Sequence, residues 1–527
     1  MALIVAALLP VPATASAVPG DPLAAYVRAR AADADGAADV AARGYAEALT
    51  ARPDDAIIAV RALREGLASG DMMLARRAAA ALRRADVAPA DIELLAFADA
   101  VVAKDAAGRR AVLERLADTP VGLLVPLMAA WTGDVAPAIG KAVPGGSIAR
   151  RYAAENQALR LLATDRVADG IAALQPLVGT GGNDMDLRLN AAQLLARAGR
   201  RDVAAALLAG DDPVLSRTAA TLGRGRKGDA RFGVSRLFAR MAGDLSAEGT
   251  ESLAIVLTRA ALVLDPDYAR ARLALADALA RDGSVAAAQA TLAAIPADDP
   301  FAPPAAALRV TILQRTGDTA QAIALARTLA VAPGAGVAAQ RRLADLLFEN
   351  DDHAGAAAAY AVAIDRAGAG ADWQLYLQQG AALDRAGSWD AALAALRRAV
   401  ELAPDQPAAL NYLGYAQVDR GQNVAAATRL LERAHALSPS DPAIADSLGW
   451  ARFRSGDVAA ALSLIEPAAR NEPNDPDIQE HLGDLYWASG RQIEARYVWR
   501  AAMTAARGPA AARLERKLAD GPASPQR

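Results

Sequence analysis

The clearest chemical motif in the sequence is the segment 223-GRGRKG-228, which matches the G-x-G-x-x-G pattern of dinucleotide-binding loops. That chemistry needs a strand before the loop and a helix after it, because the phosphates lie at the helix amino terminus. The preceding residues, 213–221, show no strand pattern. The sequence therefore favours a loop joining two arms of the chain over a phosphate cradle.

No other residues have a spacing that suits catalysis or metal binding. The three histidines, His353, His435 and His481, are far apart, and no two have the helical spacing of metal ligands. Carboxylate pairs such as Asp351-Asp352 fall between helical segments, where helix capping explains them. The chain has no cysteine, which excludes thiolate ligands and nucleophiles. We therefore expect no catalytic, cofactor-binding or metal-binding residue, and a protein that is not an enzyme.

Composition indicates an all-α protein. Of the 527 residues, 54% are hydrophobic but only 4% are aromatic, so the core must consist of Ala, Leu and Val. Ala and Leu favour helix, and aromatic or β-branched runs typical of strands are rare. The formal net charge of −3 offers no basic surface for nucleic acid. The expected partners are therefore proteins or peptides.

The amino terminus resembles an export signal. Residues 1–17 form a short apolar run that ends in Ala15-Ser16-Ala17, a small-x-small cleavage pattern before Val18. No basic residue precedes the run, so the alternative is an apolar first helix of a cytoplasmic protein whose start is misread. No later apolar stretch reaches the roughly 18 residues of a membrane span. We expect a periplasmic protein without a transmembrane span.

The same spacing of small and large residues recurs along the chain. The leading glycines 380, 414, 449 and 483 lie about 34 residues apart, a period typical of two-helix repeats. The copy that begins at Gly449 continues with Gly456, Ala461, Ile465, Ala468 and Pro473. Copies led by Ala29 and Ala276 follow the same spacing.

Each position of this spacing has a physical reason. The leading glycine lets the first helix approach the second, and we expect it to face the small Ala of that helix. The second glycine ends the first helix in a positive-φ conformation. Proline ends the second helix, and pairs such as Asp441-Pro442 and Asp475-Pro476 begin the next one, with Asp as the N-cap.

These positions resemble the tetratricopeptide repeat, whose pattern includes W-x2-L-G-x2-Y. Leu413-Gly414, Leu448-Gly449 and Leu482-Gly483 match the centre of that pattern. The initial Trp is absent: the four clearest copies have Tyr376, Leu410, Ala445 and Gln479 in its place. The resemblance implies an α-solenoid, a superhelix of stacked antiparallel helix pairs.

We divide the chain into four parts on this basis. Residues 1–17 are the signal, 18–225 an amino-terminal arm of divergent helix pairs, and 226–507 the carboxyl-terminal superhelix. Residues 508–527 are a polar capping helix and a tail.

The resemblance also implies a groove for a partner on the first helix of each pair. Asp446, Trp450 and Phe453 share one helical face at i, i+4 and i+7. The full predicted set is Asn411, Tyr415, Asp446, Trp450, Phe453, Glu480, Asp484 and Trp487. Rigid aromatics beside acids suit a segment with apolar and basic side chains. The alternative is that Trp450 and Trp487 only fill gaps between repeats.

Residues 447–468 and 481–502 further resemble long exported tetratricopeptide proteins of Gram-negative bacteria. Some of these present cell-wall hydrolases to a carboxyl-terminal-processing protease, so the resemblance implies an adaptor within a cell-envelope complex. A scaffold for polysaccharide or protein secretion is the alternative. An enzyme that carries repeats, such as a glycosyltransferase, would need a separate α/β region, and no segment remains for one.

Overall fold

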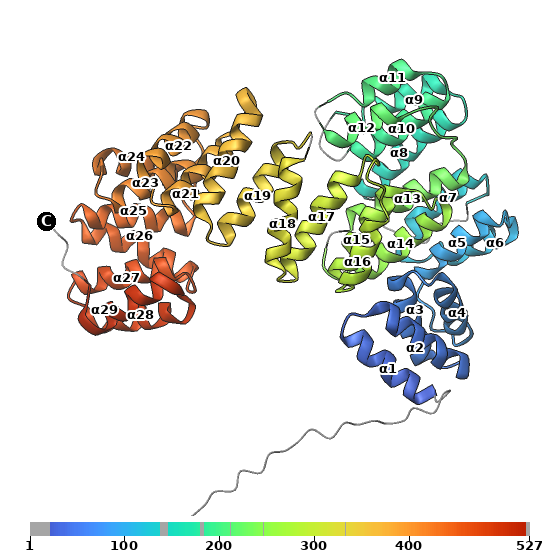
Figure 1. Ribbon diagram of the computed structural model, residues 1–527, viewed down its shortest axis with the longest axis horizontal. Helices are drawn as coiled ribbons and strands as arrows, with labels where there is room; N and C mark the ends of the chain where they lie inside the picture. The colour runs from blue at the N-terminus through green and yellow to red at the C-terminus, as the bar shows by residue number, and fades with distance from the viewer. Residues whose placement is uncertain are drawn as a thin grey trace, which may run out of the picture. The chain divides into compact units, whose positions relative to one another are not determined.

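The computed structural model describes residues 22–136, 146–179, 184–210, 212–245, 247–332 and 334–522 (Figure 1). Over these residues every regular element is a helix, which confirms the all-α prediction. The proposed signal, residues 1–17, lies outside the described residues. Contacts divide the chain into two compact units, unit 1 (Met1–Asp318) and unit 2 (Thr319–Arg527).

In the described residues, unit 1 holds the α-helices α1 to α17 and one short 3-10 helix, η1, in the numbering of Figure 1. They are α1 (Pro22–Ala34), α2 (Ala38–Ala51), α3 (Ala56–Ser69), α4 (Met72–Arg84), α5 (Ile92–Val102), α6 (Ala106–Leu116), η1 (Pro120–Leu124), α7 (Val125–Thr132), α8 (Ser147–Ala163), α9 (Val167–Leu174), α10 (Met185–Arg197), α11 (Arg201–Leu207), α12 (Pro213–Thr221), α13 (Ala230–Asp244), α14 (Glu251–Leu264), α15 (Ala269–Arg281), α16 (Val285–Ala293) and α17 (Ala302–Arg315).

Unit 2 is a stack of helix pairs in which each helix packs against the next. Its helices are α18 (Thr319–Val331), α19 (Val337–Glu349), α20 (His353–Ala367), η2 (Gly368–Gly370), α21 (Trp373–Arg385), α22 (Trp389–Leu402), α23 (Pro407–Asp419), α24 (Val424–Leu437), α25 (Pro442–Arg454), α26 (Val458–Asn471), α27 (Pro476–Ala488), α28 (Gln492–Ala505) and α29 (Gly508–Asp520). The first helices of successive pairs, α23, α25 and α27, also contact one another. This arrangement is the predicted α-solenoid.

The predicted helix boundaries are confirmed where the repeat is clearest. Asp441 caps α25 by accepting hydrogen bonds from the backbone N–H groups of Ala443 and Ile444, at 2.9 and 3.2 Å. Asp475 caps α27 in the same way, and a proline occupies the first turn of both helices. Gly456 and Gly490 follow the first helices with φ of 89° and 80°. Asp, Pro and Gly therefore act here as N-cap, first-turn residue and helix terminator, as their residue types predict.

The leading glycines approach the second helix closely, and the nearest atoms belong to the large residue of that helix. A Cβ added to Gly449 would lie 2.5 Å from Cγ1 of Ile465, and one on Gly483 would lie 2.2 Å from Nε1 of Trp499. Gly380 and Gly414 face Leu396 and Leu431 in the same way. The small Ala that we expected is a further neighbour at two of the four positions, since a Cβ on Gly414 or Gly449 would also lie 3.1 or 3.3 Å from the carbonyl oxygen of Ala427 or Ala461. The large residue needs the missing Cβ, because its side chain crosses the first helix at this point.

Unit 1 does not stack in simple chain order, as the helix pairs predicted over residues 18–225 would. Helix α5 packs against α14, and α14 also contacts α3. Arg259 of α14 donates to the carbonyl oxygens of Leu67 and Ala68, at 2.7 and 2.8 Å. Helix α5 has buried residues on several sides, including Leu94, and a helix that is apolar all round needs cover on more than one face.

The contacts divide the chain at a different place from the predicted arms. We expected arms to meet near residue 225, whereas α13 to α17 group with the amino-terminal helices. Packing of α13 on α5, α7 and α8 and of α14 on α5 accounts for this grouping. The arms 18–225 and 226–507 stay a prediction about domain organisation.

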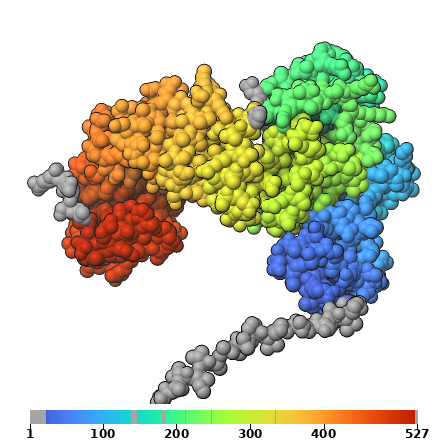
Figure 2. Space-filling view, viewed as in Figure 1, coloured from blue at the N-terminus to red at the C-terminus, as the bar shows by residue number. Residues whose placement is uncertain are grey.

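The carboxyl-terminal end of unit 2 is closed by α29, the predicted capping helix. It packs against α27 and α28, and Leu514 is fully buried there. In Figure 2, α27 to α29 (red) adjoin the preceding pairs (orange) without a break. Within the part of the chain that the structure describes, no helix combines the length and apolar character that crossing a membrane requires.

Candidate functional site

The eight predicted groove residues lie on α23, α25 and α27, the three adjacent first helices of unit 2. We call the side of these helices that carries them the binding face. Three of its residues are buried carboxylates, and five are half-buried aromatic or amide side chains. The two kinds of residue have different surroundings.

Asp446 is paired with a histidine that the sequence did not lead us to include. Its Oδ2 lies 2.8 Å from Nδ1 of His481, and both side chains are buried. Burial lowers the pKa of His481, but the charge and hydrogen bond of Asp446 outweigh burial and raise the pKa above its ordinary value. The pair joins α25 to α27 across the binding face.

Aromatic rings surround this pair. Trp450 stacks on the ring of His481, with centroids 4.1 Å apart and an interplanar angle of 17°. The ring centroid of Tyr415 lies 6.1 Å from that of His481, and the ring centroid of Phe453 lies 5.3 Å from that of Trp450. Trp450 of α25 thus packs against α27 of the next repeat, yet its side chain stays half-exposed.

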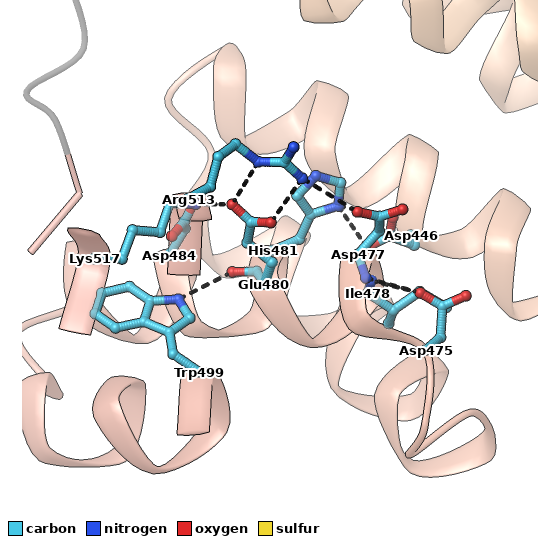
Figure 3. Close-up of polar contacts among 10 residues, drawn as sticks. All are labelled: Asp446, Asp475, Asp477, Ile478, Glu480, His481, Asp484, Trp499, Arg513 and Lys517. Atoms are coloured by element: carbon cyan, nitrogen blue, oxygen red, sulfur yellow. Dashed lines mark hydrogen bonds and ion pairs between the residues drawn. The ribbon is translucent and has the colours of Figure 1, made fainter. Parts of the chain in front are cut away.

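Glu480 and Asp484 are occupied by two cations of the capping helix. Arg513 donates from Nε and Nη2 to the two carboxylate oxygens of Glu480, at 3.2 and 2.9 Å. Lys517 Nζ lies 2.6 Å from both Glu480 Oε1 and Asp484 Oδ2. Figure 3 shows Arg513 and Lys517 reaching toward these carboxylates from α29. Both acids are thus neutralised within the chain.

The two acids respond differently to this environment. Burial raises the pKa of Glu480, but its hydrogen bonds to Arg513 and Lys517 outweigh burial and hold the pKa below its usual value. For Asp484, burial outweighs the attraction of Lys517 and raises the pKa. The Oδ1 atom of Asp484 is buried and has no hydrogen-bond partner within the described chain. Asp484 is therefore the less well satisfied of the two.

Trp487 lies at the end of the binding face and packs inside the last repeat. Its ring centroid is 5.5 Å from that of Trp499, and the guanidinium of Arg496 lies 4.8 Å from its centroid. A Cβ on Gly521 would lie 2.5 Å from its ring. Gly521, directly after α29, thus lies against Trp487.

Besides Oδ1 of Asp484, two further polar atoms on the binding face are buried without a partner in the described residues. These are Oδ1 of Asn411, on α23, and Nε1 of Trp450, on α25. Within the described chain neither atom has a hydrogen-bond partner, although the two residues themselves remain half-exposed. Leaving such a group unpaired costs about 1–3 kcal/mol. A ligand that paired them would recover that free energy.

Three residues that build this site were missed at the sequence level: His481, Arg513 and Lys517. The two cations are four residues apart in the capping segment, so they share one helical face. That spacing, opposite two acids in the last repeat, was a usable signal. The pairing of His481 with Asp446 joins two repeats, and no sequence pattern within either repeat predicts it.

The other sequence motifs take structural roles. The 223-GRGRKG-228 segment is a loop between α12 and α13, where a Cβ on Gly225 would lie 2.0 Å from the carbonyl oxygen of Gln193. The ring of His353 contacts that of Phe348, and His435 lies in the last turn of α24. Both histidines belong to other repeats than His481. Over the described ranges, no group of three or more His, Asp or Glu side chains is placed to hold a metal ion.

Comparison with known proteins identifies the repeats. One family model described as Tetratricopeptide repeat matches residues 245–311, and a second with the same description matches 308–372, 377–442 and 447–512. Among curated proteins, none matches the chain.

Solved structures of repeat proteins resemble parts of the chain. A tetratricopeptide repeat protein from Parabacteroides merdae is 14% identical, with a TM-score of 0.41, and the match covers 48% of this chain and 97% of that one. MamA (41-end) from Desulfovibrio magneticus is 18% identical, with a TM-score of 0.28 and coverage of 33% and 97%. A thermophilic tetratricopeptide repeat protein from Thermus thermophilus is 19% identical, with a TM-score of 0.31 and coverage of 35% and 98%. With TM-scores below 0.5, they add nothing on how this chain is arranged.

The helix pairs of unit 2, the positions of their glycines and the matched family models all indicate the same repeat. Stacked repeats of this type present extended surfaces and in general act as scaffolds for protein–protein interaction. The chain belongs to the tetratricopeptide repeat family.

Proposed function

We propose that the binding face of unit 2 holds an extended segment of another protein. The segment would lie across α23 and α25, with an apolar side chain against Tyr415, Trp450 and Phe453. Aromatic residues of this kind are the usual anchors of protein interfaces, because they bury a large area with few rotatable bonds.

The observation that carries this proposal is the pair of unpartnered atoms on the same face. Asn411 Oδ1 accepts and Trp450 Nε1–H donates, and neither is paired within the described residues. A peptide main chain offers both an N–H and a C=O, so it complements both atoms. Binding would therefore relieve two buried unpaired groups at once.

The charge around Tyr415 favours a basic residue in the bound segment. Burial raises the pKa of the Tyr415 phenol, and the negative charges of Asp419, Asp446 and Asp477 raise it further. Asp419 is exposed and has no ion-pair partner in the described part of the chain. Glu480 and Asp484 are already paired with α29, so the basic residue would lie toward Asp419.

Cross-linking tests the proposal at the level of single residues. A photoreactive phenylalanine analogue placed at position 450 should cross-link a partner in cells. The same analogue at Tyr497, which is 66% exposed on the second helix α28, is the matched control and should give no such product. Equal products from both positions, or none from position 450 in a folded variant, would contradict the assignment.

We further propose that the protein is an exported adaptor of the cell envelope, one that presents substrates to an envelope protease. The apolar residues 1–17 with their Ala-x-Ala ending and the resemblance of residues 447–502 to exported repeat proteins support this role. Sequencing of the mature protein from a periplasmic extract should give Val18 as the first residue. An intact Met1 in the cytoplasmic fraction would overturn the export proposal and leave the binding face untouched.

The identity of the cross-linked partner separates the remaining roles. Recovery of a protease or a cell-wall hydrolase from position 450 supports the adaptor. Recovery of components of a secretion assembly would replace it with the scaffold for polysaccharide or protein export.

A further inference from the structure

A cavity of about 280 Å³ lies within unit 1, between α10, α12 and α13 and the loops before α15 and α17. It contains none of the residues of the binding face. Thr221 and Arg226, which line it, are exposed, so the cavity opens to solvent at this rim. It is near the lower limit of volume for sites that bind small ligands.

The lining of the cavity includes a buried arginine with an unused donor among the described residues. Arg236 is 3% exposed, and its guanidinium lies 4.3 Å from the ring centroid of Phe232 and 4.0 Å from that of Tyr268. Its Nη1 donates to Ser235 and to Asp265. Its Nε is buried and unpartnered within the residues that the structure describes. The aromatic rings and the ion pair fix the guanidinium, so this donor has a defined position.

A second unpaired atom lines the same cavity. The side-chain Oε1 of Gln193, on α10, is buried and accepts no hydrogen bond in the described part of the molecule. The cavity thus has one free donor and one free acceptor, each costing about 1–3 kcal/mol while unpaired. A ligand that brings an acceptor to Arg236 and a donor to Gln193 complements both.

The charges of the cavity argue against an anionic ligand. Arg226 and Arg236 both pair with Asp265, and Asp267 and Asp299 add negative charge to the lining. Two backbone N–H groups of the glycine-bearing loop are also in use: Gly225 donates to Leu222 and Arg226 donates to Gln193, at 3.0 and 3.2 Å. These two N–H groups are therefore not free to bind a phosphate.

We infer that this cavity binds an uncharged amide of a peptide. The amide C=O accepts from Arg236, its N–H donates to Gln193, and an adjoining apolar side chain lies against Phe301. The volume admits about one residue, and the open rim at Thr221 lets the peptide chain continue on both sides. Unit 1 thereby gains a peptide site independent of the one in unit 2.

Calorimetry on the full chain with defined probes tests this inference. Acetyl-phenylalanine amide should bind, and acetyl-Ala-Phe-Ala-amide should bind more tightly because its chain extends over the rim. Acetyl-phenylalanine, with its free carboxylate, should bind at least tenfold more weakly, and inorganic phosphate should not bind. Tighter binding of phosphate or of the carboxylate, or no gain from the longer peptide, would overturn the inference.

Substitution of Gln193 separates binding from stability. Gln193→Leu keeps the volume and removes an unpaired buried acceptor, so the melting temperature should stay or rise while affinity for the tripeptide falls about tenfold. Gln175→Leu, at an exposed glutamine outside the cavity, is the control and should change neither. Thr221→Trp, which fills the cavity from its rim, should abolish binding. Unchanged affinity in Gln193→Leu and Thr221→Trp would contradict the site.

Discussion

At the scale of single residues, the repeat is maintained by contacts between one glycine and one large side chain. Gly380, Gly414, Gly449 and Gly483 each leave space that a Leu, Ile or Trp of the next helix occupies. The sequence spacing predicted the close approach, because only the smallest residue recurs at that position. It placed the small Ala opposite the glycine, whereas the large residue lies nearest, since the crossing point of two helices depends on their packing rather than on either sequence.

Gly449→Ala tests this contact. The added Cβ meets Ile465, so the variant should lose about 1–3 kcal/mol of stability in urea unfolding. Adding Ile465→Ala removes the clash, and a double-mutant cycle should therefore give a favourable coupling of about 1 kcal/mol or more. Strictly additive effects of the two substitutions would show that the residues do not meet.

The buried pair of His481 and Asp446 makes the stability of unit 2 depend on pH. Burial lowers the pKa of His481, Asp446 outweighs burial, and Asp484 and Lys517 add smaller opposing effects, so the net pKa in the folded protein lies above 6.5. Because the pKa of His481 is higher in the folded than in the unfolded protein, its protonated form stabilises the fold. This contribution to the free energy of unfolding is complete at a pH below the unfolded pKa, and it is lost as pH rises through the folded pKa.

We therefore expect the urea midpoint of the wild-type protein to fall as pH rises from about 6 upward. His481→Gln should flatten that dependence, whereas His353→Gln, in a different repeat, should preserve it. A wild-type midpoint that rises over the same range would refute the charged pair.

At the scale of elements, the capping helix α29 neutralises the end of the binding face as well as covering it. Arg513 and Lys517 pair with Glu480 and Asp484, two of the acids that the sequence assigned to a partner. The capping helix itself was predictable from its amphipathic pattern. The ion pairs of Arg513 and Lys517 with these acids were not predictable in the same way. The sequence does not show whether the counterion of an acid on an inner face comes from a partner or from the chain itself.

Lys517→Met tests this role of α29. It leaves two carboxylates buried without their shared cation and should cost about 3 kcal/mol, seen as faster hydrogen exchange in α27 to α29. Arg516→Met, at an exposed neighbour on the same helix, should change exchange little. Equal exchange in the two variants would mean that Lys517 does not hold the helix.

At the scale of the whole molecule, the two units are both built of helices but differ in the order in which those helices pack. Unit 2 stacks in chain order, and its period was readable from the sequence over 380–505. Unit 1 returns on itself, with α14 of one segment packed on α3 and α5 of another. A helix such as α5, which is apolar on all sides, can pack against several other helices, so its sequence does not determine which one it contacts. The local pattern therefore predicted the helices of unit 1 but not their packing partners.

The most direct test of the account is the affinity of the partner cross-linked at position 450 for conservative variants of the binding face. Trp450→Phe keeps an aromatic ring and removes the unpaired N–H, and Asn411→Leu removes the unpaired acceptor. We predict that each weakens binding about tenfold by calorimetry while the unfolding free energy stays the same or rises. Tyr497→Phe should leave both unchanged. Wild-type affinity in Trp450→Phe and Asn411→Leu would contradict the central claim that this face holds another protein.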